Sequence, residues 1–346
     1  MNRKYNNFDL LRLLLAIIVV IVHTAELSQI ELLHHFSKFF SSVIAVDSFF
    51  IVSGFLIFMS YENSSSLLRY TSKRVRRIFP AYATVILLCA FLFYFISTKS
   101  FDEYFNIEFI RYIVSNLFTL NFIQPTLAGV FETNPLQAIN GALWTIKIEI
   151  AFYILVPLVV YLFSKSNKLF TLSTIYLFSI IYSMVLMGLF ESTNLQIYLK
   201  LEKQIFGQLA FFVSGAFLYY YYDLFMRNAF YIFIVASTIL LIDHFIINIY
   251  FLYPLSLSIV VIYFATQLKY LGDFGKFGDL SFGLYIWHFP IVQLFVHFHL
   301  FDNLALGLTL LIFVLFSISL LLWHVIEKRF LYPSSHYIEV EEKKSI

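Results

Sequence analysis

Three ionisable residues in apolar segments have the types and spacing to support acid–base chemistry. His23 follows Arg12 by eleven residues, so on a helix the two lie about 16 Å apart on nearly the same face. Asp47 follows a short apolar stretch, and Glu149 ends the segment 143–149. If these segments cross a membrane, both carboxylates enter from the side opposite Arg12 and reach the depth of His23. Carboxylates there could orient an imidazole and stabilise its protonated form.

A structural interpretation stands beside this catalytic one. The histidine could bond a neighbouring helix, and all three residues could form a polar network that holds three helices together. A charged side chain deep in a membrane span costs at least ~2.5–3.5 kcal/mol on insertion scales, so it marks a functional position by default. The shared depth of the three residues favours chemistry.

A second histidine shares a helical stripe with two hydroxyl groups. Ser281, Tyr285 and His288 are spaced i, i+4 and i+7, and Pro290 should kink the helix nearby. We expect this stripe in the inner half of its span. The wall of a channel and a packing seam between helices both fit the pattern.

A basic run lies at the start of another apolar segment. Five basic residues fall within positions 69–77, and Arg74 and Arg77 share one helical face. Guanidinium forks suit phosphate oxygens, which would make this a site for a phosphorylated ligand. The alternative is ordinary topogenic charge, which needs no ligand.

The composition indicates that membrane helices position these residues. The chain has 346 residues, of which 60% are apolar and 13% are charged, whereas soluble domains carry about 25% charged residues. A net charge of +2 gives no indication of a nucleic-acid partner. The single cysteine, Cys89, excludes an intrachain disulfide. We therefore predict an all-α integral membrane protein surrounded by a lipid bilayer.

Ten segments are apolar enough to be predicted as spans, although the seventh is short. They are 10–29, 40–60, 80–97, 143–163, 169–190, 205–222, 229–243, 246–266, 280–300 and 303–326. The stretch 109–123 contains Arg111 and several polar residues, so we expect an interfacial or re-entrant piece there.

The distribution of charge gives the expected orientation. With ten spans and a cytoplasmic N-terminus, most of the 23 basic residues fall on the cytoplasmic side, as the positive-inside rule requires. An eleventh span at 109–123 would invert every later loop. Both termini are therefore expected in the cytoplasm. We expect one transmembrane domain over 1–330, a short cytoplasmic tail over 331–346, and no cleavable signal peptide in the first span.

Six motifs in order resemble the acyltransferase-3 family of bacterial membrane proteins. They are residues 8–12 with His23, 47–56, 74–80, 143–153, 281–290 and 326–329. Each motif alone is weak, but together they cover nearly the whole chain in the expected order.

The resemblance implies a membrane-embedded acyltransferase of the bacterial cytoplasmic membrane. Such enzymes move an acyl group, commonly acetyl, from cytoplasmic acyl-CoA to a hydroxyl of a cell-surface glycan or glycolipid such as O-antigen or capsule. By this resemblance His23 matches the catalytic histidine, and Glu149 matches the acid of the Trp-containing motif. Arg12, Arg74 and Arg77 match the residues linked to donor binding.

A thioester donor is already activated, so no metal ion is expected. The remaining tasks are to deprotonate the acceptor hydroxyl and to stabilise the oxyanion. A neutral His23 could do the first, and an acyl-histidine intermediate is the alternative. The hydroxyl of Tyr153, one turn after Glu149, or the indole N–H of Trp144 could donate to the oxyanion.

Two other functions fit a polytopic, aromatic-rich chain. One is a flippase or polymerase for lipid-linked glycans, which would need no acyl donor. The other is a membrane scaffold or sensor, which would not need buried charges at one depth. Consumption of acyl-CoA by the purified protein separates the acyltransferase from both.

Overall fold

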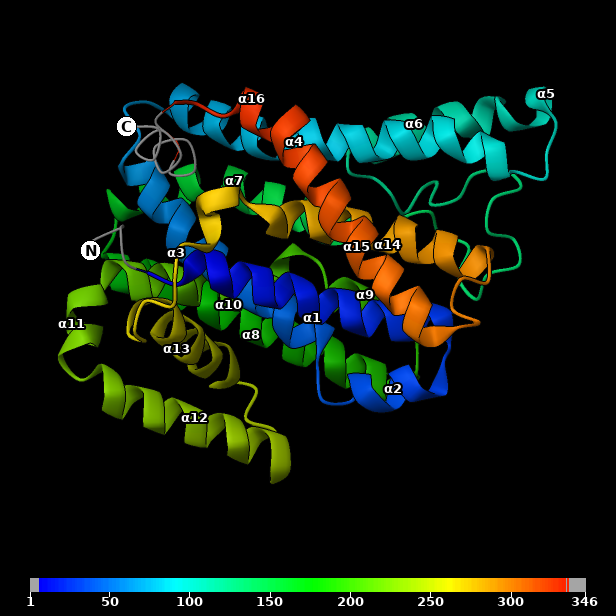
Figure 1. The fold of residues 1–346 in the computed structure, drawn as a ribbon. Coiled ribbons are helices and arrows are strands. Elements are labelled where there is room, and N and C mark those ends of the chain that lie inside the picture. Colours follow the sequence, from blue (N-terminus) through cyan, green and yellow to red (C-terminus); the bar gives the residue numbers. More distant parts are fainter. Residues whose placement is uncertain (1–5, 334, 336–346) are drawn as a thin grey trace. The chain divides into compact units, whose positions relative to one another are not determined.

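The computed structural model describes residues 6–333 and 335, and its regular secondary structure consists of helices (Figure 1). No strand occurs in this described part of the chain, so the predicted all-α class is confirmed. Four of the basic residues that we expect on the cytoplasmic side lie outside the described residues: Arg3, Lys4, Lys343 and Lys344. Most of the predicted tail 331–346 also lies outside them. The orientation of the termini across a membrane stays a prediction.

Seven helical segments of the described chain are long and apolar enough to cross a membrane. They are Phe8–Ser28, Ser42–Glu62, Leu67–Ile96, Gly141–Phe163, Lys168–Thr193, Leu280–His297 and Leu304–Phe330. Each overlaps one of the ten predicted spans, although Leu67–Ile96 begins 13 residues before the predicted start at 80.

The other three predicted spans contain shorter helices. They are α10 (Ile205–Tyr220), α12 (Ala229–Phe245) and α13 (Tyr253–Thr266). Helix α13 begins seven residues after the predicted start at 246, with Pro254 in its first turn. Proline fits the first turn of a helix because the missing N–H would have no partner there. The apolar run 246–266 is therefore longer than the helix that it contains.

The stretch 109–123 forms no long helix. Helix α6 (Ile107–Leu117) has 11 residues, which is about 16 Å and too short for a hydrocarbon core of about 30 Å. The Asn106 side chain caps its start by accepting from the backbone N–H groups of Glu108 and Phe109. Thr119, at φ 61°, follows its end. The expectation of a piece that does not span is consistent with this length.

The helices form two compact units whose stretches alternate along the chain. The first unit contains residues 6–11, 46–71 and 148–272, and the second contains 12–45, 72–147 and 273–335. The single domain predicted over 1–330 stays a prediction.

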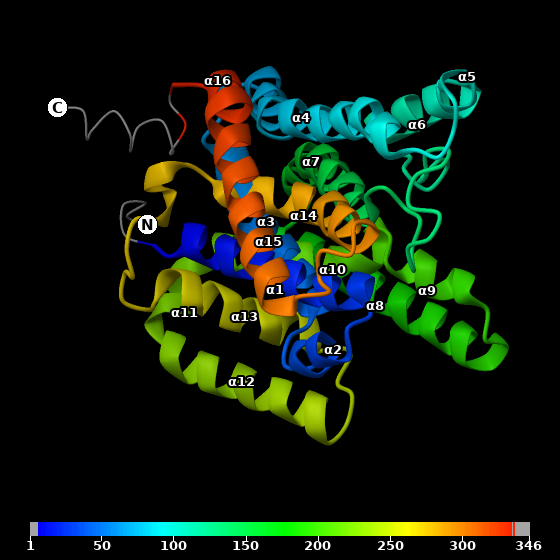
Figure 2. The same ribbon diagram turned by 45° about the vertical axis from the view of Figure 1, so that its right-hand side comes forward.

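In the first unit, α3 (Ser42–Glu62) and α10 approach to backbone contact. A Cβ atom on Gly54 would lie 1.9 Å from the Phe212 carbonyl oxygen, and one on Gly215 would lie 2.1 Å from that of Ile51. Small residues permit such close approach between helices in membranes. Helices α12 and α13 lie side by side in both ribbon views (Figures 1 and 2).

In the same unit, α7 (Trp144–Phe163) contains a proline, and a side chain from another helix bonds the carbonyl that this proline leaves without a partner. Pro157 has no N–H for the carbonyl of Tyr153, four residues earlier. The Tyr70 hydroxyl donates to that carbonyl oxygen at 3.0 Å, so the buried oxygen keeps a hydrogen bond. The helix can therefore continue through the proline.

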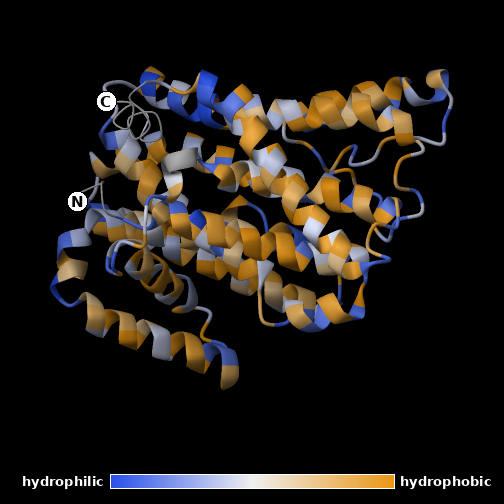
Figure 3. Cartoon of the chain, in the orientation of Figure 1, coloured by the Kyte–Doolittle hydropathy of each residue, from blue (hydrophilic) through white to orange (hydrophobic). Residues whose placement is uncertain are grey.

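In the second unit, α14 (Leu280–His297) and α15 (Leu304–Leu322) lie side by side (Figures 1 and 2). A Cβ atom on Gly283 would be 3.0 Å from Ser319, so this contact is tight. The hydropathy colouring shows mostly apolar helices and a hydrophilic first half of α4 (Leu67–Leu92) (Figure 3). That half carries the basic run at 69–77.

Candidate active site

A pair of histidines lies in the second unit. His23 on α1 (Phe8–Ser28) is half-buried, and His288 on α14 is fully buried. Nδ1 of His23 lies 2.8 Å from Nε2 of His288. The rings are stacked with an interplanar angle of 25°, and the ring of Phe289 meets His23 edge-on. The two side chains therefore share a hydrogen bond and leave Nε2 of His23 outside it.

The second nitrogen of His288 is also occupied. Its Nδ1 lies 2.6 Å from the backbone carbonyl oxygen of Tyr285, one turn earlier. The Tyr285 hydroxyl lies 2.7 Å from the Thr145 hydroxyl, and both are buried. Tyr285 thus holds the His288 ring through its backbone and the start of α7 through its side chain.

The loop before α7 supports the middle of α14. Pro290 has no N–H for the carbonyl of Ile286, and the Asn140 side chain donates to that oxygen at 2.8 Å. The Gln293 amide donates to the backbone oxygens of Leu136 and Ala138. The loop thereby satisfies the polar groups on both sides of Pro290, so His288 stands on a supported helix.

An ion network lies at the start of α14. Asp279 is buried and pairs with Arg12 of α1 at 3.2 Å and with Arg77 of α4. Its other oxygen accepts from the backbone N–H of Ser281 at 3.1 Å and from the Ser281 hydroxyl. Asp279 therefore caps α14 and joins it to α1 and α4.

Arg77 has a second acidic partner. It pairs with Glu327, whose side chain is only 1% exposed and which ends the π-helical turn Trp323–Glu327 after α15. Gly278, at φ 98°, allows the Trp323 ring to pack closely, since a Cβ atom there would lie 2.2 Å from it. The network thus brings two basic and two acidic side chains together. Asp279, Arg12, Arg77 and Glu327 are called the ion network below.

The ion network and the histidine pair join α1 and α14 at two levels. Arg12 precedes His23 by eleven residues and Asp279 precedes His288 by nine, which correspond to about 16 Å and 14 Å of helix. The helices therefore run in the same direction. The expectation that His288 lies in the inner half while His23 lies in the outer half is wrong, because the two rings touch. Ser281 lies beside the ion network.

The predicted carboxylates belong to the first unit. Asp47 on α3 is buried, and Glu149 on α7 is half-buried. Glu149 accepts hydrogen bonds from the hydroxyls of Tyr153 and of Ser53, the latter at 3.5 Å. Tyr153 shares the face of Glu149, as its spacing predicts. The clustering of both carboxylates with His23, and the role of Tyr153 toward an oxyanion, stay predictions.

Arg74 and Trp144, two further residues with predicted roles in the site, lie on α4 and α7. Arg74 is half-buried on α4, three residues before Arg77. Trp144 is the first residue of α7 and is half-buried. The donor-binding role of the arginines and the oxyanion role of Trp144 stay predictions.

Asp279 and Glu327, the two acids of the ion network, are not among the site residues predicted from the sequence. Asp279 stands just before an apolar run, where an acidic side chain is a typical helix cap. Glu327 lies inside the motif 326–329 that the family resemblance uses. These two sequence features mark Asp279 as a helix cap and Glu327 as part of a family motif. Neither feature identifies the arginines with which the two acids pair.

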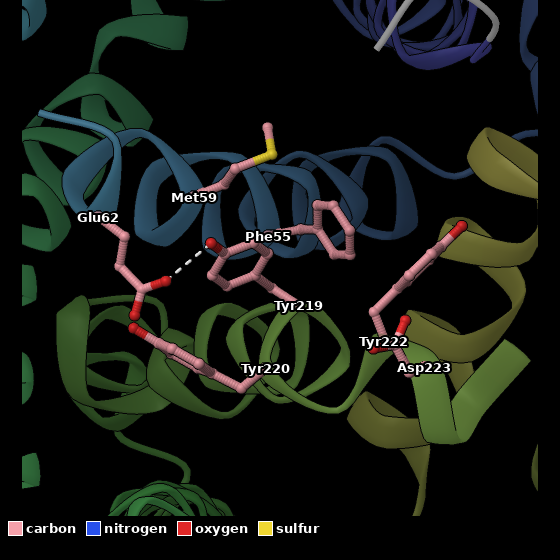
Figure 4. A pocket seen from close by; sticks show the side chains of 7 residues that line it. All are labelled: Phe55, Met59, Glu62, Tyr219, Tyr220, Tyr222 and Asp223. Atoms are coloured by element: carbon pink, nitrogen blue, oxygen red, sulfur yellow. Dashed lines mark hydrogen bonds between the residues drawn. The ribbon is translucent and has the colours of Figure 1, made fainter. Parts of the chain in front are cut away.

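The first unit contains a separate pocket of about 260 Å³ (Figure 4). Its lining consists of Phe55, Met59, Glu62, Tyr219, Tyr220, Tyr222 and Asp223. Glu62 accepts from the Tyr219 hydroxyl at 2.8 Å, and the Lys168 ammonium lies 4.3 Å from the centre of the Tyr220 ring. No predicted site residue lines this pocket. Across the described residues, no group of three or more His, Cys, Asp or Glu is arranged to hold a metal ion.

Comparison with known proteins gives the family. The acyltransferase-3 family model, described as an acyltransferase domain, matches residues 5–326. An O-acetyl transferase of Shigella phage Sf6 is 29% identical over 349 residues, which cover 98% of this chain and 99% of that protein. Nodulation protein 10 of Rhizobium leguminosarum bv. viciae is 30% identical over 176 residues, covering 47% of this chain and 46% of that protein. No solved structure matches the chain significantly. The chain belongs to the acyltransferase-3 family and is a multi-pass membrane O-acyltransferase.

Proposed function

We propose that the enzyme moves an acyl group, in the first instance acetyl, from cytoplasmic acyl-CoA to a hydroxyl of a cell-surface glycan or glycolipid. The observation that carries this proposal is the half-buried His23, hydrogen-bonded through Nδ1 to His288, with Nε2 left for a substrate. The likeness to a phage O-acetyl transferase along the whole chain supports acetyl as the group and oxygen as its acceptor atom.

The proposed chemistry is a direct acyl transfer. Nε2 of His23 takes the proton of the acceptor hydroxyl while that oxygen attacks the thioester carbon. The new C–O bond forms, the C–S bond breaks, and the proton passes from His23 to the leaving sulfur. The products are an ester and the free thiol of the donor, so atoms and charge balance without a further reactant.

Donor binding is proposed at the arginines of α1 and α4. Arg12, Arg74 and Arg77 carry planar forks that match phosphate oxygens. The ion network gives Arg12 and Arg77 a structural task as well, because Asp279 and Glu327 already neutralise them. A donor phosphate at these residues would therefore compete with two buried carboxylates, whereas Arg74 stands one turn away on the same helix.

The proposed arrangement puts donor and acceptor on opposite faces of the bacterial cytoplasmic membrane. The basic run at 69–77 favours the cytoplasmic side, and His23 lies about 16 Å further along α1 than Arg12. Coenzyme A is large and charged, so it should stay in the cytoplasm while its pantetheine arm reaches toward His23. The acceptor should meet the acyl group from the outer side.

Sealed vesicles of known orientation test this arrangement. Acyl-CoA and the acceptor glycan are each confined to one face, and ester formation is measured by mass spectrometry. Transfer should require acyl-CoA on the face that bears residues 73–77 and the acceptor on the other. Efficient transfer with both substrates on that one face would refute the cross-membrane arrangement.

The role of His23 is tested by His23→Ala. General-base catalysis contributes about 10²–10⁴-fold, so transfer should fall by at least 10² while insertion and folding persist. His244→Ala is the matched control, because His244 is exposed at the end of α12. Transfer by well-folded His23→Ala at the rate of the control would overturn the mechanism.

A further inference from the structure

We infer that His288 is a positioning residue: it fixes the proton of His23 on Nδ1 and thereby turns Nε2 into the basic atom. The inference rests on the proposed function for its catalytic meaning. The hydrogen-bond geometry that carries it lies within the second unit and does not depend on the identity of the substrates.

The first step is the tautomer of His288. Its Nδ1 lies 2.6 Å from the carbonyl oxygen of Tyr285. A carbonyl oxygen can only accept, so Nδ1 must carry the hydrogen. In a neutral imidazole the other nitrogen, Nε2, then holds a lone pair and can only accept.

The second step is the charge of His288. The ring is fully buried, and its polar contacts among the described residues are the backbone carbonyls of Tyr285 and Leu284 and another imidazole, none of which is an anion. A buried cation without a counter-ion is costly to hold, which favours the neutral ring. Its Nε2 is therefore an acceptor.

The third step transfers this constraint to His23. Its Nδ1 lies 2.8 Å from the accepting Nε2 of His288, so His23 must donate from Nδ1. A neutral His23 then has its lone pair on Nε2, the nitrogen outside the pair. Nε2 can take the proton of a hydroxyl, and the resulting imidazolium still donates through Nδ1 to a neutral partner. His288 thus does for His23 what a carboxylate or carbonyl does for many catalytic histidines.

The surroundings keep His288 in place for this task. Asn140, in the loop before α7, donates to the Ile286 carbonyl that Pro290 leaves without an N–H, and the hydroxyl of Thr145, in the first turn of α7, is hydrogen-bonded to the Tyr285 hydroxyl. A Cβ atom on Gly141 would lie 2.7 Å from the Phe289 ring, so the loop also packs tightly beside the pair. The acceptor atom offered to His23 is therefore held by several independent contacts.

Two substitutions separate positioning from simple packing. His288→Leu puts an apolar side chain of similar bulk in place of the imidazole and so removes the acceptor nitrogen Nε2. His288→Gln can present an amide oxygen close to the former Nε2. We expect kcat to fall about 10²-fold in His288→Leu, with KM for acyl-CoA within about two-fold, because binding residues are unchanged. Glutamine should restore kcat to within about ten-fold of wild type, and His244→Gln should leave it unchanged.

A spectroscopic measurement does not depend on turnover. In lipid bilayers, nitrogen-15-labelled histidine reports which ring nitrogen is protonated, and comparison with His23→Ala identifies the His23 signals. We expect wild-type His23 to be protonated on Nδ1 alone and His288→Leu to show both tautomers.

The outcomes separate the two proposals. Protonation of wild-type His23 on Nε2, or unchanged kcat in folded His288→Leu, would overturn the inference. Absence of acyl transfer in the wild-type protein would instead count against the proposed function, while the tautomer of His23 would still be measured. A His288→Leu protein that fails to fold leaves the wild-type spectrum and the glutamine variant to decide.

Discussion

Replacing Asp279 should cost more stability than replacing any exposed acid of the same unit. The side chain of Asp279 is 4% exposed and faces Arg12 and Arg77, which are 19% and 16% exposed. Removing one partner of a buried ion pair costs about 3–5 kcal/mol, because the remaining charge stays buried. Part of each arginine side chain stays exposed, so we expect the lower end, about 3 kcal/mol, for Asp279→Asn.

The cap at the start of α14 adds a second, separable contribution. Asparagine can still accept from the Ser281 backbone N–H, whereas alanine cannot, and a lost cap costs about 1 kcal/mol. Asp279→Ala should therefore lose about 4 kcal/mol, one more than Asp279→Asn. Asp302→Asn is the control, because that carboxylate is exposed between α14 and α15, and it should change stability by less than about 0.5 kcal/mol.

The free energy of unfolding can be followed by tryptophan fluorescence as SDS is titrated into detergent micelles. Trp323 packs against Gly278, next to Asp279, and so reports on this region. A double-mutant cycle with Arg77→Gln should give a coupling of about 0.5–3 kcal/mol. If Asp279→Asn lies within about 0.5 kcal/mol of the Asp302→Asn control, the ion network does not stabilise the unit and the reasoning fails.

Three further variants test other contacts. The double substitution Arg74→Lys with Arg77→Lys keeps the charge but loses the planar forks, so acyl-CoA binding measured by calorimetry should weaken about ten-fold with topology intact. Unchanged affinity would leave Arg77 with its role in the ion network and Arg74 with topology alone. Asn140→Leu removes the donor to the buried Ile286 carbonyl and should lower the free energy of unfolding by about 1–3 kcal/mol in the same SDS titration. Gln137→Leu, on the exposed part of that loop, is the control and should not show this loss. Gly215→Ala would push a methyl group into the backbone of α3 and should cost about 1–3 kcal/mol, whereas the open position Gly188→Ala should be neutral or stabilising; equal effects would contradict the close packing.

Features that depend on local spacing could be predicted from the sequence. A long apolar run implies a membrane helix, and each of the ten predicted spans contains a helix. Glu149 and Tyr153 are four residues apart, so helix periodicity alone puts them on one face, and their side chains do bond. The length of an apolar run is less informative about where a helix begins, as Pro254 illustrates.

Features that depend on which helix faces meet could not be predicted in the same way. His23 and His288 are separated by 265 residues, and periodicity gives each a face without indicating the partner. The same applies to Arg77 and Glu327, which pair across 250 residues. The expected depths of His23 and His288 cannot both hold, because each is counted from the expected membrane boundary of its own span. The contact itself depends on where α14 lies relative to α1, and the pair between Arg12 and the Asp279 cap joins the two helices at the start of α14.

The second unit combines segments from the beginning, the middle and the end of the chain, so it cannot be completed until the last of them has been synthesised. Asp279 is made 267 residues after Arg12, which at 5–20 residues per second is a delay of roughly 13–50 s. During that interval α1 exists without its acidic partner, and the long stem of Arg12 lets its charge stay in water at a membrane surface. Completion of the second unit is therefore a late event in biogenesis. A chain released before α14 is made contains His23 but neither the imidazole that holds its ring nor the acid that neutralises Arg12.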